Sequence, residues 1–131
     1  MQNTVALAAL ALTGLAGCGL VPTSGDAGVC SGPVTVQVTN SEVPVISWTP
    51  ACRTDYVAVG YAGLNDVWWA YSLTRSRIGP SIKVGDAPPG TRAESMLPLV
   101  RGVQYSVSVG WRRADAVGQE VGSWGYTRFV R

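Results

Sequence analysis

Hydrophobic and polar residues alternate with a period of two along most of the chain after residue 33. Each alternating segment is short and is bounded by Gly, Pro, Asn, Asp or Ser, and none shows the helical period of 3.6. This pattern predicts seven or eight short antiparallel strands that each bury one face, and therefore an all-β fold. The segments are residues 34–38, 44–48, 56–62, 67–73, 81–84, 93–97, 103–113 and 123–130.

The first two segments predict a hairpin that brings two cysteines together. Folding the chain about Ser41 places Val36 opposite Ile46, and the same register brings Cys30 opposite Cys52. A disulfide between them would close a loop of about 22 residues and stabilise the fold by about 3 kcal/mol in the chain-entropy model. Two separate buried thiols or a metal-binding pair are the alternatives, but the chain has no His and no further ligand cluster for a metal.

A tight turn at Arg101-Gly102 introduces a strand in which Tyr105, Val107 and Val109 share one face. The order of a leucine, a turn glycine and a tyrosine at the head of the strand resembles the tyrosine corner of immunoglobulin-like and fibronectin type III sandwiches. The resemblance implies that the hydroxyl of Tyr105 bonds back to the preceding corner.

Two further segments resemble the fibronectin type III family. The run Ile46-Ser47-Trp48-Thr49-Pro50 matches its apolar-x-Trp-Thr-Pro setting, and residues 57–61 match its tyrosine-containing third strand. Arg101 stands where the family corner usually has proline, and the longer middle segments leave the pairing of residues 63–92 open. The resemblance implies a fibronectin type III-like sandwich over residues 31–131. The structural core residues that this resemblance implies are Trp48, Leu99, Gly102 and Tyr105.

The N-terminal part of the chain has a different pattern. Residues 5–15 form an uncharged apolar run, which fits the apolar region of a signal peptide and is too short to span a bilayer as a helix. Residues 19–28 are rich in glycine and show no periodicity, as expected for a flexible tether. We therefore expect these residues to contribute little to the core.

The run Leu15-Ala16-Gly17-Cys18 resembles the lipobox of bacterial lipoproteins. The resemblance implies that residues 1–17 are removed and that Cys18 carries a diacylglycerol on its sulfur and an acyl chain on its new amine. It makes residues 18–30 a lipidated tether to the membrane, since two or three acyl chains anchor a protein stably. Gly19 after the anchor favours an outer membrane, if the organism has one, and otherwise the outer face of the plasma membrane.

Composition argues against several functions. The net charge is +2, and the nine arginines and one lysine are scattered, so nucleic-acid binding is not expected. Without His there is no ordinary general base at neutral pH, and no enzyme activity, metal or cofactor other than the lipid is expected. The carboxylates lie mostly in predicted turns and are expected to be solvated: Asp26, Glu42, Asp55, Asp66, Asp86, Glu94, Asp115 and Glu120.

A strip of small residues marks a candidate binding face. Its predicted members are Ala58, Gly60, Ala62, Ser106, Ser108 and Gly110. Aromatic residues on the neighbouring strands would form walls on which a peptide or glycan could stack, unless they pack over the strip and complete the domain. Strand alternation sends one of Trp68 and Trp69 inward, and Trp111, in phase with Tyr105, is expected in the core. The candidate binding residues are Trp68, Trp69, Tyr71, Arg112, Trp124 and Tyr126.

Together these features predict a membrane-anchored cell-envelope lipoprotein with a non-catalytic protein- or glycan-binding domain. A structural accessory subunit without a ligand site is the alternative, and a small hydrolase is the least supported one. In this fold the chain enters at the end that carries residues 51–54 and a long loop over residues 114–122. The tether would hold that end near the membrane, which leaves the sheet face or the far end for ligands.

Overall fold

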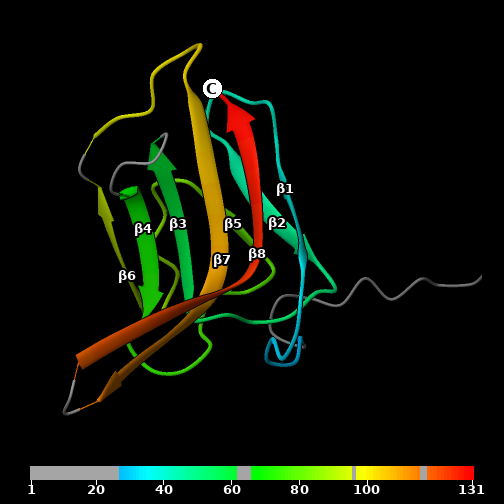
Figure 1. Ribbon diagram of the computed structural model, residues 1–131, viewed down its shortest axis with the longest axis vertical. Helices are drawn as coiled ribbons and strands as arrows, with labels where there is room; N and C mark the ends of the chain where they lie inside the picture. The colour runs from blue at the N-terminus through cyan, green and yellow to red at the C-terminus, as the bar shows by residue number, and fades with distance from the viewer. Residues whose placement is uncertain (1–26, 62–65, 96, 116–117) are drawn as a thin grey trace, which may run out of the picture.

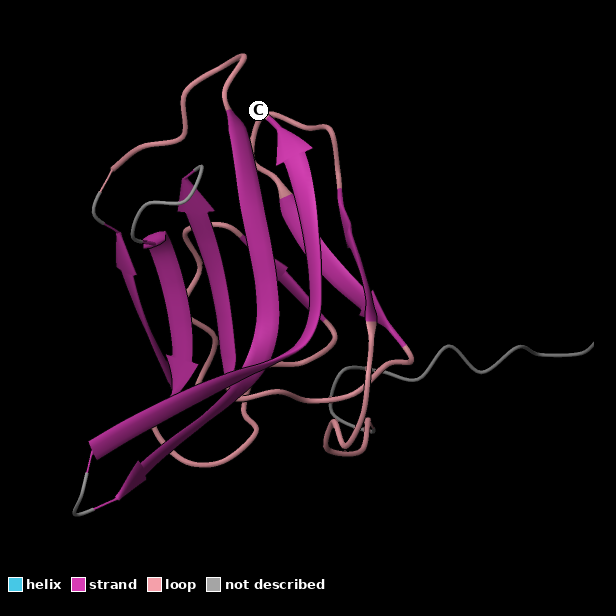
Figure 2. Cartoon of the chain, viewed as in Figure 1, coloured by secondary structure: helices cyan, strands magenta, loops and turns pink. Residues whose placement is uncertain are grey.

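The structure is a computed structural model that describes residues 27–61, 66–95, 97–115 and 118–131. In this part of the chain eight strands and no helix form two layers (Figures 1 and 2). The strands are β1 (Thr35–Val38), β2 (Val45–Thr49), β3 (Tyr56–Tyr61), β4 (Asp66–Ser72), β5 (Ser81–Lys83), β6 (Thr91–Ser95), β7 (Gln104–Asp115) and β8 (Gly118–Val130).

The strands form two antiparallel sheets. One has the order β1-β2-β5 and the other the order β6-β4-β3-β7-β8. The pairing that the sequence left open is therefore resolved, since β4 lies between β3 and β6 while β5 joins the other sheet. The predicted all-β, two-layer architecture is confirmed.

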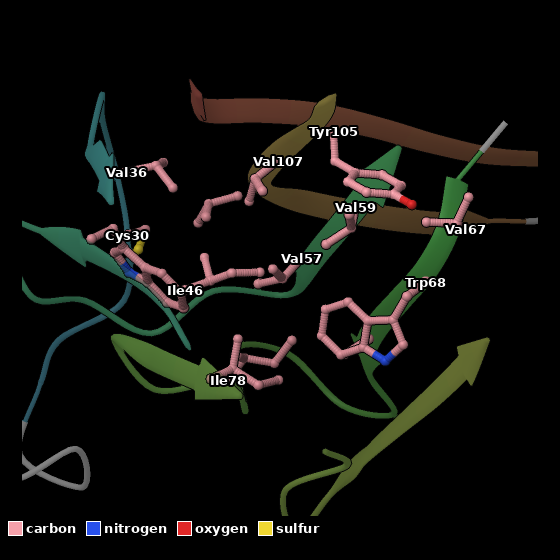
Figure 3. Packing of buried hydrophobic residues seen from close by; sticks show 14 of the residues in the cluster. Cys30, Val36, Ile46, Val57, Val59, Val67, Trp68, Ile78, Tyr105 and Val107 are labelled. Carbon is pink, nitrogen blue, oxygen red and sulfur yellow. The ribbon is translucent and has the colours of Figure 1, made fainter. Parts of the chain in front are cut away.

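The core lies between the two sheets and consists of the inward residues of the alternating segments. Val57, Val59 and Val107 come from the larger sheet and Ile46 comes from the smaller one (Figure 3). Trp48 of the smaller sheet also belongs to this core. All five are almost completely buried. Burying each aliphatic side chain of this size contributes about 1.5–3 kcal/mol, so this layer holds the sheets together.

The predicted corner before β7 is present. Gly102 has φ 77°, a left-handed conformation that costs little for glycine. The backbone N–H of Val100 donates a hydrogen bond of 2.7 Å to the hydroxyl oxygen of Tyr105, and Leu99 packs partly against the core. The Tyr105 ring is buried, with the ring of Phe129 5.7 Å away between centroids. The expected bond from the tyrosine back to its corner is therefore confirmed.

The first hairpin has a different register from the one expected. Val36 lies opposite Trp48 instead of Ile46, a shift of two residues. The cause is Thr39, whose N–H donates to Val45 O at 3.0 Å and whose Oγ1 accepts from Val45 N at 2.9 Å, which closes the loop over residues 40–44. A shift of two residues keeps every side chain on its expected face, so the core is unchanged.

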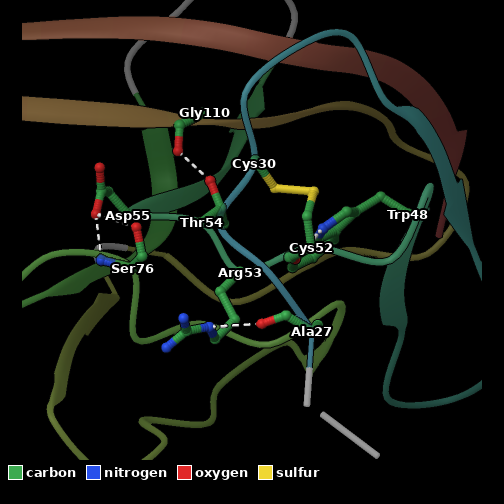
Figure 4. The surroundings of a disulfide bond; sticks show 9 residues. All are labelled: Ala27, Cys30, Trp48, Cys52, Arg53, Thr54, Asp55, Ser76 and Gly110. Atoms are coloured by element: carbon green, nitrogen blue, oxygen red, sulfur yellow. Dashed lines mark hydrogen bonds between the residues drawn. A yellow bond between two sulfur atoms is a disulfide. The ribbon is translucent and has the colours of Figure 1, made fainter. Parts of the chain in front are cut away.

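The predicted disulfide between Cys30 and Cys52 is confirmed, with 4.9 Å between the Cα atoms. It does not continue the hairpin, because the segment before β1 runs parallel to the chain at Arg53. Cys30 N–H donates to Arg53 O at 2.8 Å, Arg53 N–H donates to Gly28 O at 2.7 Å, and Arg53 Nε donates to Ala27 O at 2.8 Å (Figure 4). Residues 27–30, expected in the tether, therefore belong to the folded domain.

The loop expected over residues 114–122 is largely a hairpin instead. The β7–β8 pairing continues beyond the sandwich, from Gly110 opposite Ser123 to Asp115 opposite Gly118. A bulge at Val109/Gly110 coincides with a bend, after which the two strands cross below β4 as an arm (Figure 1). We call the part of β7 and β8 beyond this bulge the arm.

Glycines allow the close approach of the two strands of the arm. A Cβ atom on Gly110 would collide with the carbonyl oxygen of Gly122, and one on Gly122 would collide with the indole of Trp111. The Trp111 ring thus lies on Gly122, with the Arg113 guanidinium 5.0 Å from a ring centroid. Trp111 is only partly buried, so the expectation that it belongs to the core is wrong. The bulge at Val109/Gly110 lies between Tyr105 and Trp111, and the two side chains therefore no longer share the inward face of β7.

The two ends of the sandwich carry different features (Figure 1). The lower end in that view holds the first described residues, drawn in blue, the crossing segment 50–55, the loop 73–80 and the arm. The upper end holds the corner before β7 and the C-terminus. The described N-terminal residues and the arm therefore lie at the same end of the domain.

Candidate functional site

The outer face of the five-stranded sheet carries most of the candidate binding residues. The register places Trp69, Ala58, Ser108 and Tyr126 in one row across β4, β3, β7 and β8. Three strand spacings separate the first and last members of the row by about 14 Å. Tyr126 is 53% exposed and Trp69 is half-buried, so both rings are accessible from this side.

The strip of small residues on this face is only partly open. Tyr56 donates a hydrogen bond of 2.6 Å to Asp66 Oδ2. Because Asp66 lies opposite Gly60, four residues further along the strand, the Tyr56 side chain runs along the sheet past Ala58. Ala58 is consequently only 3% exposed. Sequence reasoning missed Tyr56, although its phase with Ala58 and Gly60 on one strand was available as a signal.

The environment of Tyr56 keeps its phenol protonated. Burial raises the pKa of Tyr56 well above its usual value, the hydrogen bond to Asp66 and the charge of that carboxylate raise it further, and the charge of Arg112 lowers it in smaller measure. Tyr56 therefore acts as a neutral hydrogen-bond donor that ties β3 to the start of β4.

Two predicted members of the binding face lie elsewhere. Trp68 is 2% exposed and belongs to the core, because a bulge at Val59/Gly60 leaves both Val67 and Trp68 buried (Figure 3). Trp124 has no pairing partner at the β7–β8 bulge and packs against the core cluster. Trp68 is therefore a packing residue, and Trp124 uses part of its surface for packing.

Arg112 connects the outer face to the arm. Its guanidinium carbon lies 4.3 Å from the centroid of the Tyr71 ring, and its Nη2 donates to Gln119 Oε1 at 3.2 Å. The two predicted residues Tyr71 and Arg112 are therefore in contact through a cation–π interaction. Arg112 also marks the boundary between the outer face and a pocket at the base of the arm.

This pocket has a volume of about 440 Å³ and lies where the loop after β4 meets the arm. We call it the arm pocket. Three of its lining side chains carry a positive charge and one carries a negative charge. Its lining residues are Asp55, Ser72, Leu73, Thr74, Arg75, Arg112 and Arg113.

Buried polar contacts shape the loop that forms one wall of the arm pocket. Ser76 is buried with φ 56°, a conformation unusual for a residue other than glycine, and its backbone N–H donates to Asp55 Oδ1 (Figure 4). The hydroxyl of the buried Thr54 donates to the carbonyl of Gly110, which fastens the same region to the base of the arm. Asp55, expected to be a solvated turn residue, is therefore a half-buried structural acceptor.

Three predictions concern residues that the structure does not describe, namely lipidation at Cys18, removal of residues 1–17 and the place of Ala62 in the strip. Within the described ranges no helix has the length and hydropathy needed to cross a membrane. The described Cys, Asp and Glu side chains form no group of three or more that could hold a metal ion. Comparisons of the chain with protein-family models, with curated proteins and with solved structures found no match.

Proposed function

We propose that this chain is a membrane-anchored lipoprotein of the bacterial cell envelope whose domain is a non-catalytic binding module for a protein or a glycan. The observation that carries the proposal is the outer face of the larger sheet. Trp69, Tyr71 and Tyr126 are partly or largely exposed there, and the two serines Ser106 and Ser108 lie between them.

The chemistry of this face suits an extended ligand. Aromatic rings offer large rigid surfaces on which sugars and apolar side chains stack, and hydroxyl groups add hydrogen bonds. The separation of about 14 Å between the positions of Trp69 and Tyr126 matches about four residues of an extended peptide. The covering of Ala58 by Tyr56 makes the face shallow, which favours a ligand lying along the surface over one enclosed in a cleft.

The topology supports the finer assignment to a fibronectin type III-like domain. In immunoglobulin-like sandwiches the strands A-B-E adjoin in one sheet and C-F-G in the other. The adjacencies β1-β2-β5 and β3-β7-β8 follow the same order, and the tyrosine corner lies where this fold has it. Strand β6, which extends the larger sheet beyond β4, is a departure from this pattern.

The lipobox-like run that ends at Cys18 supports anchoring. The folded domain begins by Ala27, nine residues later, and a flexible chain of that length reaches about 17 Å. A diacylglycerol and an acyl chain at Cys18 would therefore hold the domain close to the membrane surface, with the outer membrane favoured where the organism has one.

Glycan and peptide arrays with the mature protein in detergent test the binding function. We expect Trp69→Ala and Tyr126→Ala each to weaken ligand retention about tenfold, since stacking on one ring is worth about 1 kcal/mol or more. Leu97→Ala, which removes an exposed apolar side chain away from this face, is the matched control and should change nothing.

Thermal unfolding of the same variants separates a binding site from packing. A loss of stability of about 3 kcal/mol or more in Trp69→Ala would show that the ring completes the core. Arrays that retain no ligand, or that retain it equally with both variants, would favour the alternative of a structural accessory subunit. The intact mass of the native protein tests the anchor, because an unmodified chain that keeps residues 1–17 contradicts it.

A further inference from the structure

The side chains that line the arm pocket carry more positive than negative charge. Its guanidinium groups belong to Arg75, Arg112 and Arg113, and its one carboxylate belongs to Asp55. That carboxylate already accepts from the N–H and the hydroxyl of Ser76. Among the described residues no ion pair links any of the three arginines to a carboxylate. Glu120 lies opposite Arg113 in the pairing of the arm but forms no ion pair with it, so the pocket lining keeps an excess of positive charge.

Several hydrogen-bond donors of these arginines are unused. Arg112 Nε is covered from solvent and has no acceptor. Arg75 and Arg113 are exposed and form no hydrogen bond with another described residue, although Arg113 lies over the ring of Trp111. Guanidinium groups present several donors in a fixed plane that matches the oxygens of a phosphate. The unused donors thus point to a phosphate-bearing ligand.

Exposed apolar side chains accompany this charged pocket. Leu73, one of its lining residues, is 61% exposed; Val121 is exposed on the arm opposite Arg112, and Val29 is exposed beside Arg53. Arginines with exposed aliphatic side chains beside them are the combination that binds the interface of an anionic membrane. The first described residues, drawn in blue, also lie at the end of the domain that carries the arm (Figure 1).

We propose that the arm pocket receives the phosphate of an anionic phospholipid headgroup, so that the domain rests on the membrane with the arm and the loop 73–75 against the surface. The orientation rests on the proposed lipid anchor, which delivers the chain to the membrane from the same end. In this orientation the outer face of the larger sheet runs away from the membrane and stays accessible to its ligand.

Vesicle binding by the full chain with Cys18→Ser tests the pocket without the lipid anchor. We expect binding to phosphatidylcholine vesicles that contain phosphatidylglycerol, little binding to phosphatidylcholine alone, and a decrease as salt rises. Arg75→Gln with Arg113→Gln in the same background should weaken binding about 30-fold, because each arginine near an anionic surface contributes about 1 kcal/mol.

Arg101→Gln with Arg131→Gln is the matched control, since it removes the same charge at the opposite end and should leave binding within about threefold. Equal losses in the two double variants would show that net charge alone acts, and would overturn the proposal. Equal binding to both kinds of vesicle would also overturn it, because the apolar residues 5–15 would then explain the attachment.

Titration with inorganic phosphate, followed by tryptophan fluorescence, distinguishes the source of the phosphate. Saturable binding of free phosphate that is lost in the Arg75→Gln/Arg113→Gln variant, without binding to anionic vesicles, would overturn the membrane proposal in favour of a soluble ligand. Failure of vesicle binding does not affect the anchor, since the Cys18→Ser chain cannot be lipidated. The anchor is refuted separately, by an unmodified mass of the native protein.

Discussion

Reducing the disulfide between Cys30 and Cys52 is expected to lower the stability of the domain by about 3 kcal/mol. The sequence separation is 22 residues. In the chain-entropy model, releasing a loop of that size raises the entropy of the unfolded chain by about 11 cal/mol/K, or about 3.4 kcal/mol at 25 °C. A domain of about 100 residues loses about 5 °C in Tm for each kcal/mol, so the expected decrease is about 15 °C.

Thermal unfolding with and without a phosphine reductant measures this effect. The Cys30→Ala/Cys52→Ala variant provides the control, since its Tm should be low from the start and should not respond to the reductant. The two cysteines are buried beside Trp48, whose Nε1 donates to Cys52 O at 2.8 Å, so near-ultraviolet circular dichroism also reports on the site. A decrease below about 4 °C would refute the reasoning, because the link would then not constrain the unfolded chain.

Hydrogen exchange distinguishes global destabilisation from local release of the N-terminal segment. The N–H groups of Cys30 and Arg53 are both bonded in the parallel pairing. If reduction only frees residues 27–30, exchange should accelerate at these two groups and stay unchanged in β3 and β7. We expect acceleration in both places, since loop closure acts on the whole unfolded chain.

Three further predictions concern single side chains. Tyr105→Phe leaves the Val100 N–H without its acceptor and should cost about 1–2 kcal/mol in urea unfolding, whereas an unchanged midpoint would exclude a structural role for the hydroxyl. Gly110→Ala drives a methyl group into the backbone of the paired strand and should cost about 2 kcal/mol or more, and a normal Tm would contradict the close approach. Because burial and Asp66 raise the pKa of Tyr56 in the folded state, its stabilising effect is complete below about pH 10 and is lost as pH rises above that value. Tyr56→Phe should therefore reduce the alkaline loss of stability, and an unchanged pH profile would contradict this assignment.

The period-two pattern was sufficient to predict the strands and their buried faces, because successive side chains of a strand point to opposite faces of the sheet. The inward residues of the first hairpin were assigned correctly even though its register was wrong by two residues, since such a shift keeps each side chain on its face. The pairing of Cys30 with Cys52 was also correct, although it does not follow from that register, because the segment before β1 runs parallel to the chain at Arg53. The corner at Tyr105 was predictable because it depends on residues that are close in the sequence.

Features that depend on bulges or on distant contacts could not be predicted in this way. The bulge at Val109/Gly110 changes the phase of β7, which moves Trp111 out of the core and turns an expected loop into the arm. The arm pocket requires the contact between Asp55 and Ser76, which are 21 residues apart and belong to two different loops. Neither loop carries a local pattern that would indicate the contact.

The position of the disulfide has a mechanical consequence for a protein held by its N-terminus. Tension applied ahead of Ala27 reaches Cys30 within three residues and passes through the covalent link to Cys52, in the segment that crosses between the sheets. The short strand β1, which has no covalent link to its neighbours within the sheet, is therefore spared from being peeled away from β2. The load is carried instead by the interior of the sandwich.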